Sequence, residues 1–84
     1  MCELLRKYIT MLSKLRFTEI VGANIREERK KKGWSQDQLS AECGFYRTYI
    51  NLVETAKRTP SSYTLFRVAK ALKVPVDNLY PSTV

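Results

Sequence analysis

Histidine is absent from this chain of 84 residues, which removes the side chain that most often serves as a general base and a frequent metal ligand. Cysteine is scarce, and Cys2 and Cys43 have neither C-x-x-C spacing nor enough partner ligands for a zinc site. The sequence also has no recognisable nucleophile–base pair and no phosphate-binding loop. We therefore expect a protein that is not an enzyme and uses no metal or cofactor.

Long uncharged apolar segments are missing as well. The N-terminal stretch MCELLRKYITMLSKL is interrupted by Arg6, Lys7 and Lys14, so it is too polar to span a membrane. Its basic, amphipathic character suits an ordinary packing helix better than a membrane surface. Two cysteines without a convincing signal peptide favour a reducing compartment. We expect a cytoplasmic protein with no membrane partner.

Acidic residues are few: 15 Lys and Arg stand against 8 Asp and Glu, for a formal net charge of +7. A small domain this basic is typical of proteins that bind a polyanion, although a merely soluble basic protein could have the same composition. With 44% hydrophobic and 27% charged residues, the chain suits one globular domain with a modest core.

Helical periodicity dominates the first third of the chain. Apolar residues recur at spacings of three and four between Glu3 and Leu15, which predicts an amphipathic helix. A second helix is expected to begin near Thr18, a candidate N-cap, and to stop at Gly33 after three lysines. One face of this second helix carries Val21, Ile25 and Arg29. Residues 1–17 thus form an N-terminal extension to a domain over 18–84.

The segment SQDQLSAECGFYRTYINLVETAKR predicts a helix-turn-helix, with the motif at about residues 35–55. Ser35 caps the first motif helix, and Gln38 takes the capping-box position three residues later. Gly44 permits the positive φ of a sharp turn. Leu39 is expected to face the core, and Cys43 to be an inert buried thiol at the end of the first motif helix. Phe45 is expected to fill the corner between the two motif helices.

The helix expected over residues 47–55 has two different sides. At about 100° per residue, the inner side carries Tyr46, Ile50 and Val53, with Tyr49 at its margin. The outer side carries short polar groups suited to reading bases. Arg47 can pair with guanine, Thr48 can bond a base or touch a thymine methyl, Asn51 can read adenine, and Leu52 can pack on a methyl group. A solvent-facing side with no partner is the alternative.

The last third supplies a loop and two further helices. Lys57 and Arg58 are expected to be exposed cations in the loop beside the reading helix. Pro60 prevents that helix from continuing. A helix opens at Ser61 or Ser62, and its core stripe is Leu65, Val68, Ala69 and Leu72. A short helix starting at Pro75 presents an apolar patch that we expect to divide between the domain's own core and a dimer interface. That patch is Val76, Leu79 and Tyr80.

Residues 19–80 resemble the repressor and Cro-type helix-turn-helix family, often called XRE. The matching pattern is I-x-x-x-R…G-W-S-Q-x-x-L-S…G-x-x-x-x-Y-I-x-x-x-E, followed by P-x-x-x-x-L-x-x-x-A-x-A-L-x-V-x-x-x-x-L. Within the family, R-T-Y-I-N and L-F-R-V-A-K-A-L are similar to the controller proteins of restriction–modification systems. The resemblance implies an all-α, compact, lambda-repressor-like domain of four or five helices, here with the extra N-terminal helical segment.

The resemblance also implies roles for individual residues. Phosphate contacts would come from Gln36, Tyr49 and Arg58, and Lys57 lies beside them in the loop. Base-reading positions would be Arg47, Thr48, Asn51 and Leu52. Arg29 and Glu54 would form an ion pair that fixes geometry. Members usually bind palindromes as dimers through the C-terminal helix.

Three positions depart from the family pattern. Ala56 stands where many members have Gly, so the turn there is expected to differ or carry strain. Ser40 replaces a common Ala, and its hydroxyl needs a local partner. Leu52 is bulkier than usual at a base-reading position, which alters the expected base preference.

Together these features predict a sequence-specific regulator of transcription that binds double-stranded DNA as a homodimer, with a restriction–modification operon or a phage-type operator as its target. Asp37 and Glu42 could touch RNA polymerase, although a solvated acidic pair is the simpler interpretation. A DNA-binding antitoxin, using its N-terminal helix against a toxin, is one alternative. An adaptor that kept the fold and lost DNA binding is another.

Overall fold

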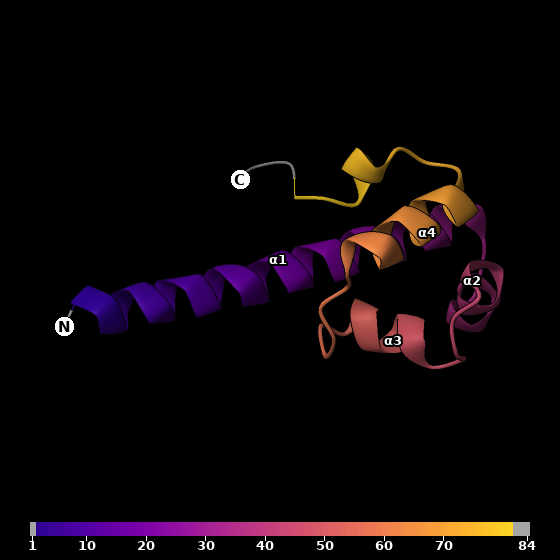
Figure 1. Ribbon diagram of the computed structural model, residues 1–84. Helices are drawn as coiled ribbons and strands as arrows, with labels where there is room; N and C mark the ends of the chain where they lie inside the picture. Colours follow the sequence, from indigo (N-terminus) through magenta and orange to yellow (C-terminus); the bar gives the residue numbers. More distant parts are fainter. Residues whose placement is uncertain (1, 82–84) are drawn as a thin grey trace.

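Helices form all of the regular structure in the described part of the chain. The computed structural model describes residues 2–81, with side-chain surroundings for Leu5 and residues 13–81. The elements are α1 (Cys2–Lys32), α2 (Gln36–Cys43), α3 (Tyr49–Glu54), α4 (Ser62–Leu72) and a 3₁₀ helix, η1 (Val76–Asn78). The first half of α1 projects outward, while α2, α3 and α4 gather around its second half (Figure 1). The prediction of an all-α domain of four or five helices is confirmed.

α1 is one continuous helix, so the predicted break before Thr18 is wrong. Thr18 lies inside the helix and donates its hydroxyl to the Lys14 carbonyl at 2.9 Å. Threonine can satisfy its hydroxyl in this way within a helix, and no Pro lies in this stretch to interrupt it. The projecting half leaves Leu5 62% and Leu15 49% exposed.

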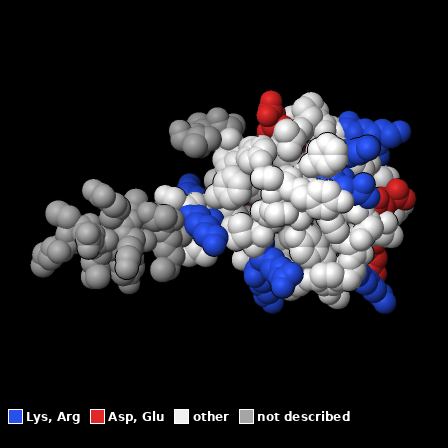
Figure 2. Space-filling view, in the orientation of Figure 1, with Lys and Arg blue, Asp and Glu red and all other residues white. Residues whose placement is uncertain are grey.

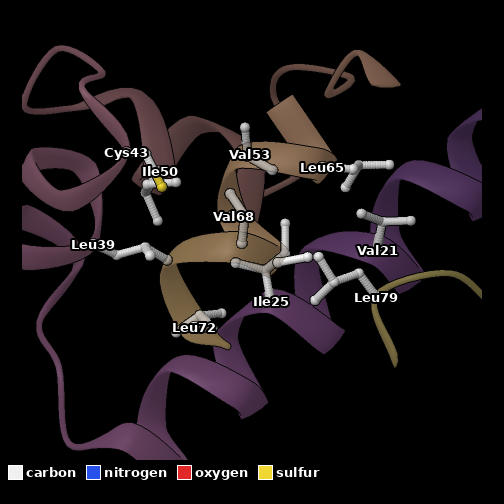
Figure 3. Close-up of a cluster of buried hydrophobic side chains, with 11 residues drawn as sticks. Val21, Ile25, Leu39, Cys43, Ile50, Val53, Leu65, Val68, Leu72 and Leu79 are labelled. Carbon is white, nitrogen blue, oxygen red and sulfur yellow. The ribbon is translucent and has the colours of Figure 1, made fainter. Parts of the chain in front are cut away.

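The hydrophobic core lies between the second half of α1 and the three shorter helices (Figure 3). Helices α1 to α4 each contribute to it through apolar residues on their inner faces, and Leu79 after η1 completes it. Its members are Val21 and Ile25 from α1, Leu39 and Cys43 from α2, Ile50 and Val53 from α3, Leu65, Val68, Ala69 and Leu72 from α4, and Leu79.

The segment after α4 covers the core beside α1. Leu79 is fully buried in the chain's own core, so its predicted place in a dimer interface is wrong. The Asn24 side-chain amide donates to the Leu79 carbonyl at 3.1 Å and holds this segment against α1. Val76 stays 38% exposed, and the half-buried Tyr80 ring lies 6.0 Å from the Phe17 ring.

α1 and α3 approach each other closely at Gly22. A Cβ atom on Gly22 would lie 2.6 Å from the Val53 carbonyl oxygen and 3.2 Å from Glu54 Cα. Both atoms belong to the α3 backbone, which cannot rotate away as a side chain could. A glycine in the middle of α1 therefore sets the distance between the long helix and α3.

Two of the three departures from the family pattern can be judged from the structure. Ala56 has φ +60°, a left-handed conformation that favours glycine, so the strain expected in this turn is present. The expectation of a local partner for Ser40 is wrong, since its buried hydroxyl oxygen has no hydrogen-bond partner. Ser40 is fully buried, so solvent water does not replace the missing partner.

Candidate nucleic-acid interface

The turn between α2 and α3 has the capped geometry that the sequence predicts. The Ser35 hydroxyl accepts from the Gln38 backbone N–H at the start of α2, and Gly44 ends the helix with φ +75°. The chain then turns and enters α3, whose inner residues Ile50 and Val53 are fully buried. These two anchors fix which side of α3 faces outward.

Three of the four expected base-reading residues are exposed together. Arg47 and Thr48 lie in the turn that leads into α3, and Asn51 lies on the helix itself. α3 begins at Tyr49, later than predicted, because Thr48 has φ −91° and ψ 0° and acts as its N-cap. Leu52 is half-buried and offers less surface than the other three.

Arg47 is held by an acidic neighbour on α2. Its Nε donates to Asp37 Oδ2 at 2.8 Å, with the two side chains 83% and 55% exposed. Such exposed pairs contribute little, about 0.2–1 kcal/mol, so the guanidinium can leave Asp37 for another acceptor. Asp37 therefore positions Arg47 without blocking it.

The residues expected to contact phosphate differ in their accessibility. Lys57 and Arg58 are exposed in the loop after α3, and Figure 2 shows basic side chains on the lower edge of the domain over this loop. Tyr49 is half-buried, and its hydroxyl lies 2.9 Å from Thr64 Oγ1. The Tyr46 side chain, expected on the inner side, is instead 53% exposed because it lies before α3 starts, where it accepts from Arg58 Nη1 at 3.3 Å.

A buried ion pair ties α1 to the end of α3. Arg29 Nε donates to Glu54 Oε2 at 2.7 Å and Arg29 Nη2 donates to Oε1 at 3.0 Å, with side chains 9% and 2% exposed. Arg29 Nη1 also donates to the Trp34 carbonyl at 2.7 Å. Because both charges are shielded from water, this pair fixes the placement of α3 more than it adds stability.

Gln36 lies between this ion pair and the outer side of α3. Its side-chain Nε2 donates to Glu54 Oε1 at 3.0 Å, and its Oε1 accepts from Asn51 Nδ2 at 3.2 Å. The sequence pattern identifies Gln36 as a phosphate contact and says nothing of these two bonds, which depend on the packing of α2 against α3.

The sequence also did not reveal the role of Arg67, a residue of α4 whose side chain bonds to the last residue of α2. Its Nη2 and Nε donate to the Cys43 carbonyl at 3.1 and 3.3 Å. Burial raises the pKa of the Cys43 thiol to about 11, and Arg67 partly opposes the shift. The thiol is therefore protonated and unreactive near neutral pH.

Within the described residues, no group of three or more His, Cys, Asp or Glu side chains is placed to hold a metal ion. The same part of the chain has no helix with the length and apolar character needed to cross a membrane.

Comparison with known proteins decides the family. Residues 25–79 match the family described as Helix-turn-helix. The chain belongs to this XRE-type helix-turn-helix family. It is 41% identical over 61 residues to the control protein C.SmaI of Serratia marcescens, which covers 73% of each chain. C.SmaI and the other proteins that the chain resembles are regulators of transcription and controller proteins rather than enzymes.

Two solved structures of helix-turn-helix proteins have the same fold. The hypothetical transcription factor NHTF from Neisseria superposes with a TM-score of 0.75 at 32% identity, over 77% of this chain and 75% of that one. The restriction–modification controller protein C.AhdI from Aeromonas hydrophila superposes with a TM-score of 0.72 at 32% identity, over 75% of this chain and 96% of that one. The expected resemblance to controller proteins is confirmed.

Proposed function

We propose that this chain is a sequence-specific regulator of transcription that binds double-stranded DNA in the cytoplasm through the start of α3. The observation that carries the proposal is the joint exposure of Arg47 and Thr48 at the entry to α3 and of Asn51 on α3 itself, while Ile50 and Val53 of the same helix are buried. A helix anchored in this way can enter the major groove with donors and acceptors facing base edges.

Affinity and discrimination would come from different residues. Lys57 and Arg58 lie next to α3 and would neutralise phosphates, which makes binding weaken steeply as salt rises. Gln36 and Tyr49 would add polar contacts to the backbone of the duplex. Arg47 and Asn51 carry the groups that guanine and adenine require, while Thr48 and the half-buried Leu52 would contact a thymine methyl.

We propose a homodimer on a palindromic operator, with the two reading helices about 34 Å apart. Val76 and Tyr80 remain partly exposed on the segment after α4 and would contribute to the dimer contact, without Leu79. Sedimentation of the protein should give a dimer, and Val76→Asp should shift it toward the monomer and weaken operator binding. A wild-type chain that stays monomeric with and without operator would disprove this assembly.

The similarity to C.SmaI and C.AhdI supports control of a restriction–modification operon as the regulatory role. An adjacent endonuclease–methylase gene pair would establish this subtype. Contact with RNA polymerase through Asp37 and Glu42 is part of the same proposal, and their exposure is compatible with it.

A second function, that of a DNA-binding antitoxin, is favoured by one observation. The projecting half of α1 leaves Leu5 and Leu15 exposed, outside the residues 25–79 that match the family. Co-purification of a small partner that is lost when residues 1–12 are deleted would support it. The division into an extension over 1–17 and a domain over 18–84 predicts that this shortened chain folds and still binds DNA.

The direct test is an unbiased selection of bound duplexes from random sequence. We expect enrichment of a two-fold symmetric site whose half-sites lie one helical turn apart. Recovery of random sequence, with weak binding that salt does not change, would point to an adaptor that has lost DNA binding.

A further inference from the structure

A buried carboxylate lies at one end of a chain of hydrogen bonds that reaches the outer side of α3. Glu54 is an acceptor only, and both of its oxygens are used by Arg29. Its side chain is 2% exposed, so it has no room to exchange these partners for water. The position and the charge of this carboxylate are therefore fixed before any ligand arrives.

The fixed carboxylate determines which way the Gln36 amide faces. An amide has a donor end and an acceptor end, and only the donor end can face a carboxylate. Gln36 accordingly directs Nε2 to Glu54 Oε1 at 3.0 Å. Its carbonyl oxygen is left to face α3.

The Gln36 amide in turn determines which way the Asn51 amide faces. Gln36 Oε1 can only accept, so the neighbouring Asn51 amide must turn its Nδ2 toward it, at 3.2 Å. This leaves Asn51 with one N–H and the Oδ1 acceptor on its exposed side. Adenine offers an N7 acceptor and an N6 donor in the major groove, which match such an amide edge.

We propose that Gln36 is a positioning residue that sets the orientation of the Asn51 amide, and with it a preference for adenine over guanine. The inference rests on the proposed function, because it assumes that Asn51 faces a base pair. Guanine presents two acceptors in the major groove, so the Asn51 amide could bind guanine as well as adenine only if it were free to turn its donors toward the base. The fixed Glu54 carboxylate thus determines the donor–acceptor direction of both hydrogen bonds, first at the Gln36 amide and then at the Asn51 amide.

The test couples Gln36→Met with Asn51→Ala. Methionine keeps the length and bulk of glutamine while it removes both hydrogen bonds. The selected duplex identifies the base pair that Asn51 reads, since its preference disappears in Asn51→Ala. At that base pair, Gln36→Met should lower the adenine-over-guanine ratio of binding constants by about three- to tenfold, as expected when one ordered side chain is freed. In the Asn51→Ala background, Gln36→Met should change this ratio no further.

The alternative is that Gln36 only contacts a phosphate. In that case Gln36→Met weakens binding equally for every base and does so in the Asn51→Ala background as well, which would overturn the inference. Circular dichroism establishes that each variant is folded, and Gln36→Leu provides a second substitution of similar bulk with the same expected result. If the wild type selects no sequence, the proposed function itself fails. If it selects one and the coupling is absent, only the positioning role fails.

Discussion

The close approach of α1 to α3 leads to a prediction about Gly22→Ala. In an exposed helix interior this substitution stabilises a protein by about 1 kcal/mol, because alanine is the better helix former. Here the new methyl group would meet the Val53 carbonyl oxygen at 2.6 Å and the Glu54 carbonyl oxygen at 3.1 Å. The α3 backbone must move back, and α3 is held in place by the buried Ile50 and Val53.

The size of the effect follows from two destabilising contributions and one stabilising contribution. Forcing an additional methyl group into a packed interior costs about 1–3 kcal/mol. The displacement also pulls Glu54 away from Arg29, and this buried pair is sensitive to small shifts in geometry. After the gain of about 1 kcal/mol in helix propensity is subtracted, overpacking alone leaves a loss of about 0–2 kcal/mol, to which the disturbed ion pair adds, so we expect Gly22→Ala to lower the free energy of unfolding. The melting temperature should fall by roughly 4–8 °C for each kcal/mol.

Urea denaturation followed by circular dichroism measures this change, and Ala23→Gly provides the matched control. Ala23 is exposed on the same helix, so its replacement should cost about 1 kcal/mol through helix propensity alone. If Gly22→Ala gains about as much stability as Ala23→Gly loses, α1 and α3 are not in close contact and the reasoning is refuted.

Three further predictions concern single buried or strained residues. Ser40→Ala removes a buried hydroxyl without a partner and should raise the free energy of unfolding by about 1 kcal/mol; a loss would reveal a partner. Ala56→Gly should remove the strain of a φ of +60° and raise the free energy of unfolding by up to about 1 kcal/mol in the same assay. An unchanged free energy of unfolding would show that the turn carries no strain. Because the folded pKa of Cys43 is raised to about 11, the unfolded thiol ionises first, so stability falls as pH rises from 9 toward 11. The loss should be smaller in Cys43→Ala; equal slopes would contradict this.

Much of the fold could be predicted because apolar residues recur at helical spacing. Ile50, Val53 and Leu65 are buried as their spacing requires, and the caps at Ser35 and Gly44 rest on local chemistry alone. These features depend on residues within one or two turns of each other, so they can be read without knowledge of the tertiary structure.

The errors arise where the outcome depends on distant parts of the chain. Thr18 has the same chemistry as an N-cap and as a residue inside a helix, and only its surroundings distinguish the two. Leu79 and Val76 are both apolar, yet the path of the chain against α1 buries one and exposes the other. The close contact at Gly22 is likewise set by the packing of α3.

The candidate site divides in the same way. The outward placement of Asn51 follows from the helical period, since the opposite side of α3 must face the core. Arg47 and Thr48 are exposed as well, but they lie in the turn before α3, where the helical period does not apply. The bonds from Gln36 to Glu54 and to Asn51 join residues 15 or more positions apart. Residue types alone do not reveal such a network.

The most direct test of base reading at α3 is to compare Arg47→Ala on the selected operator and on random duplex DNA. We predict a loss of about 1–3 kcal/mol on the operator with little change on random DNA. The control is Arg16, an exposed residue of α1 that lies near Tyr80 and Pro81 and outside α3 and its flanking loops. Arg16→Ala removes the same charge and should reduce binding slightly and equally on both duplexes. If Arg47→Ala weakens binding to operator and random DNA by the same factor, Arg47 supplies charge alone and the account is contradicted.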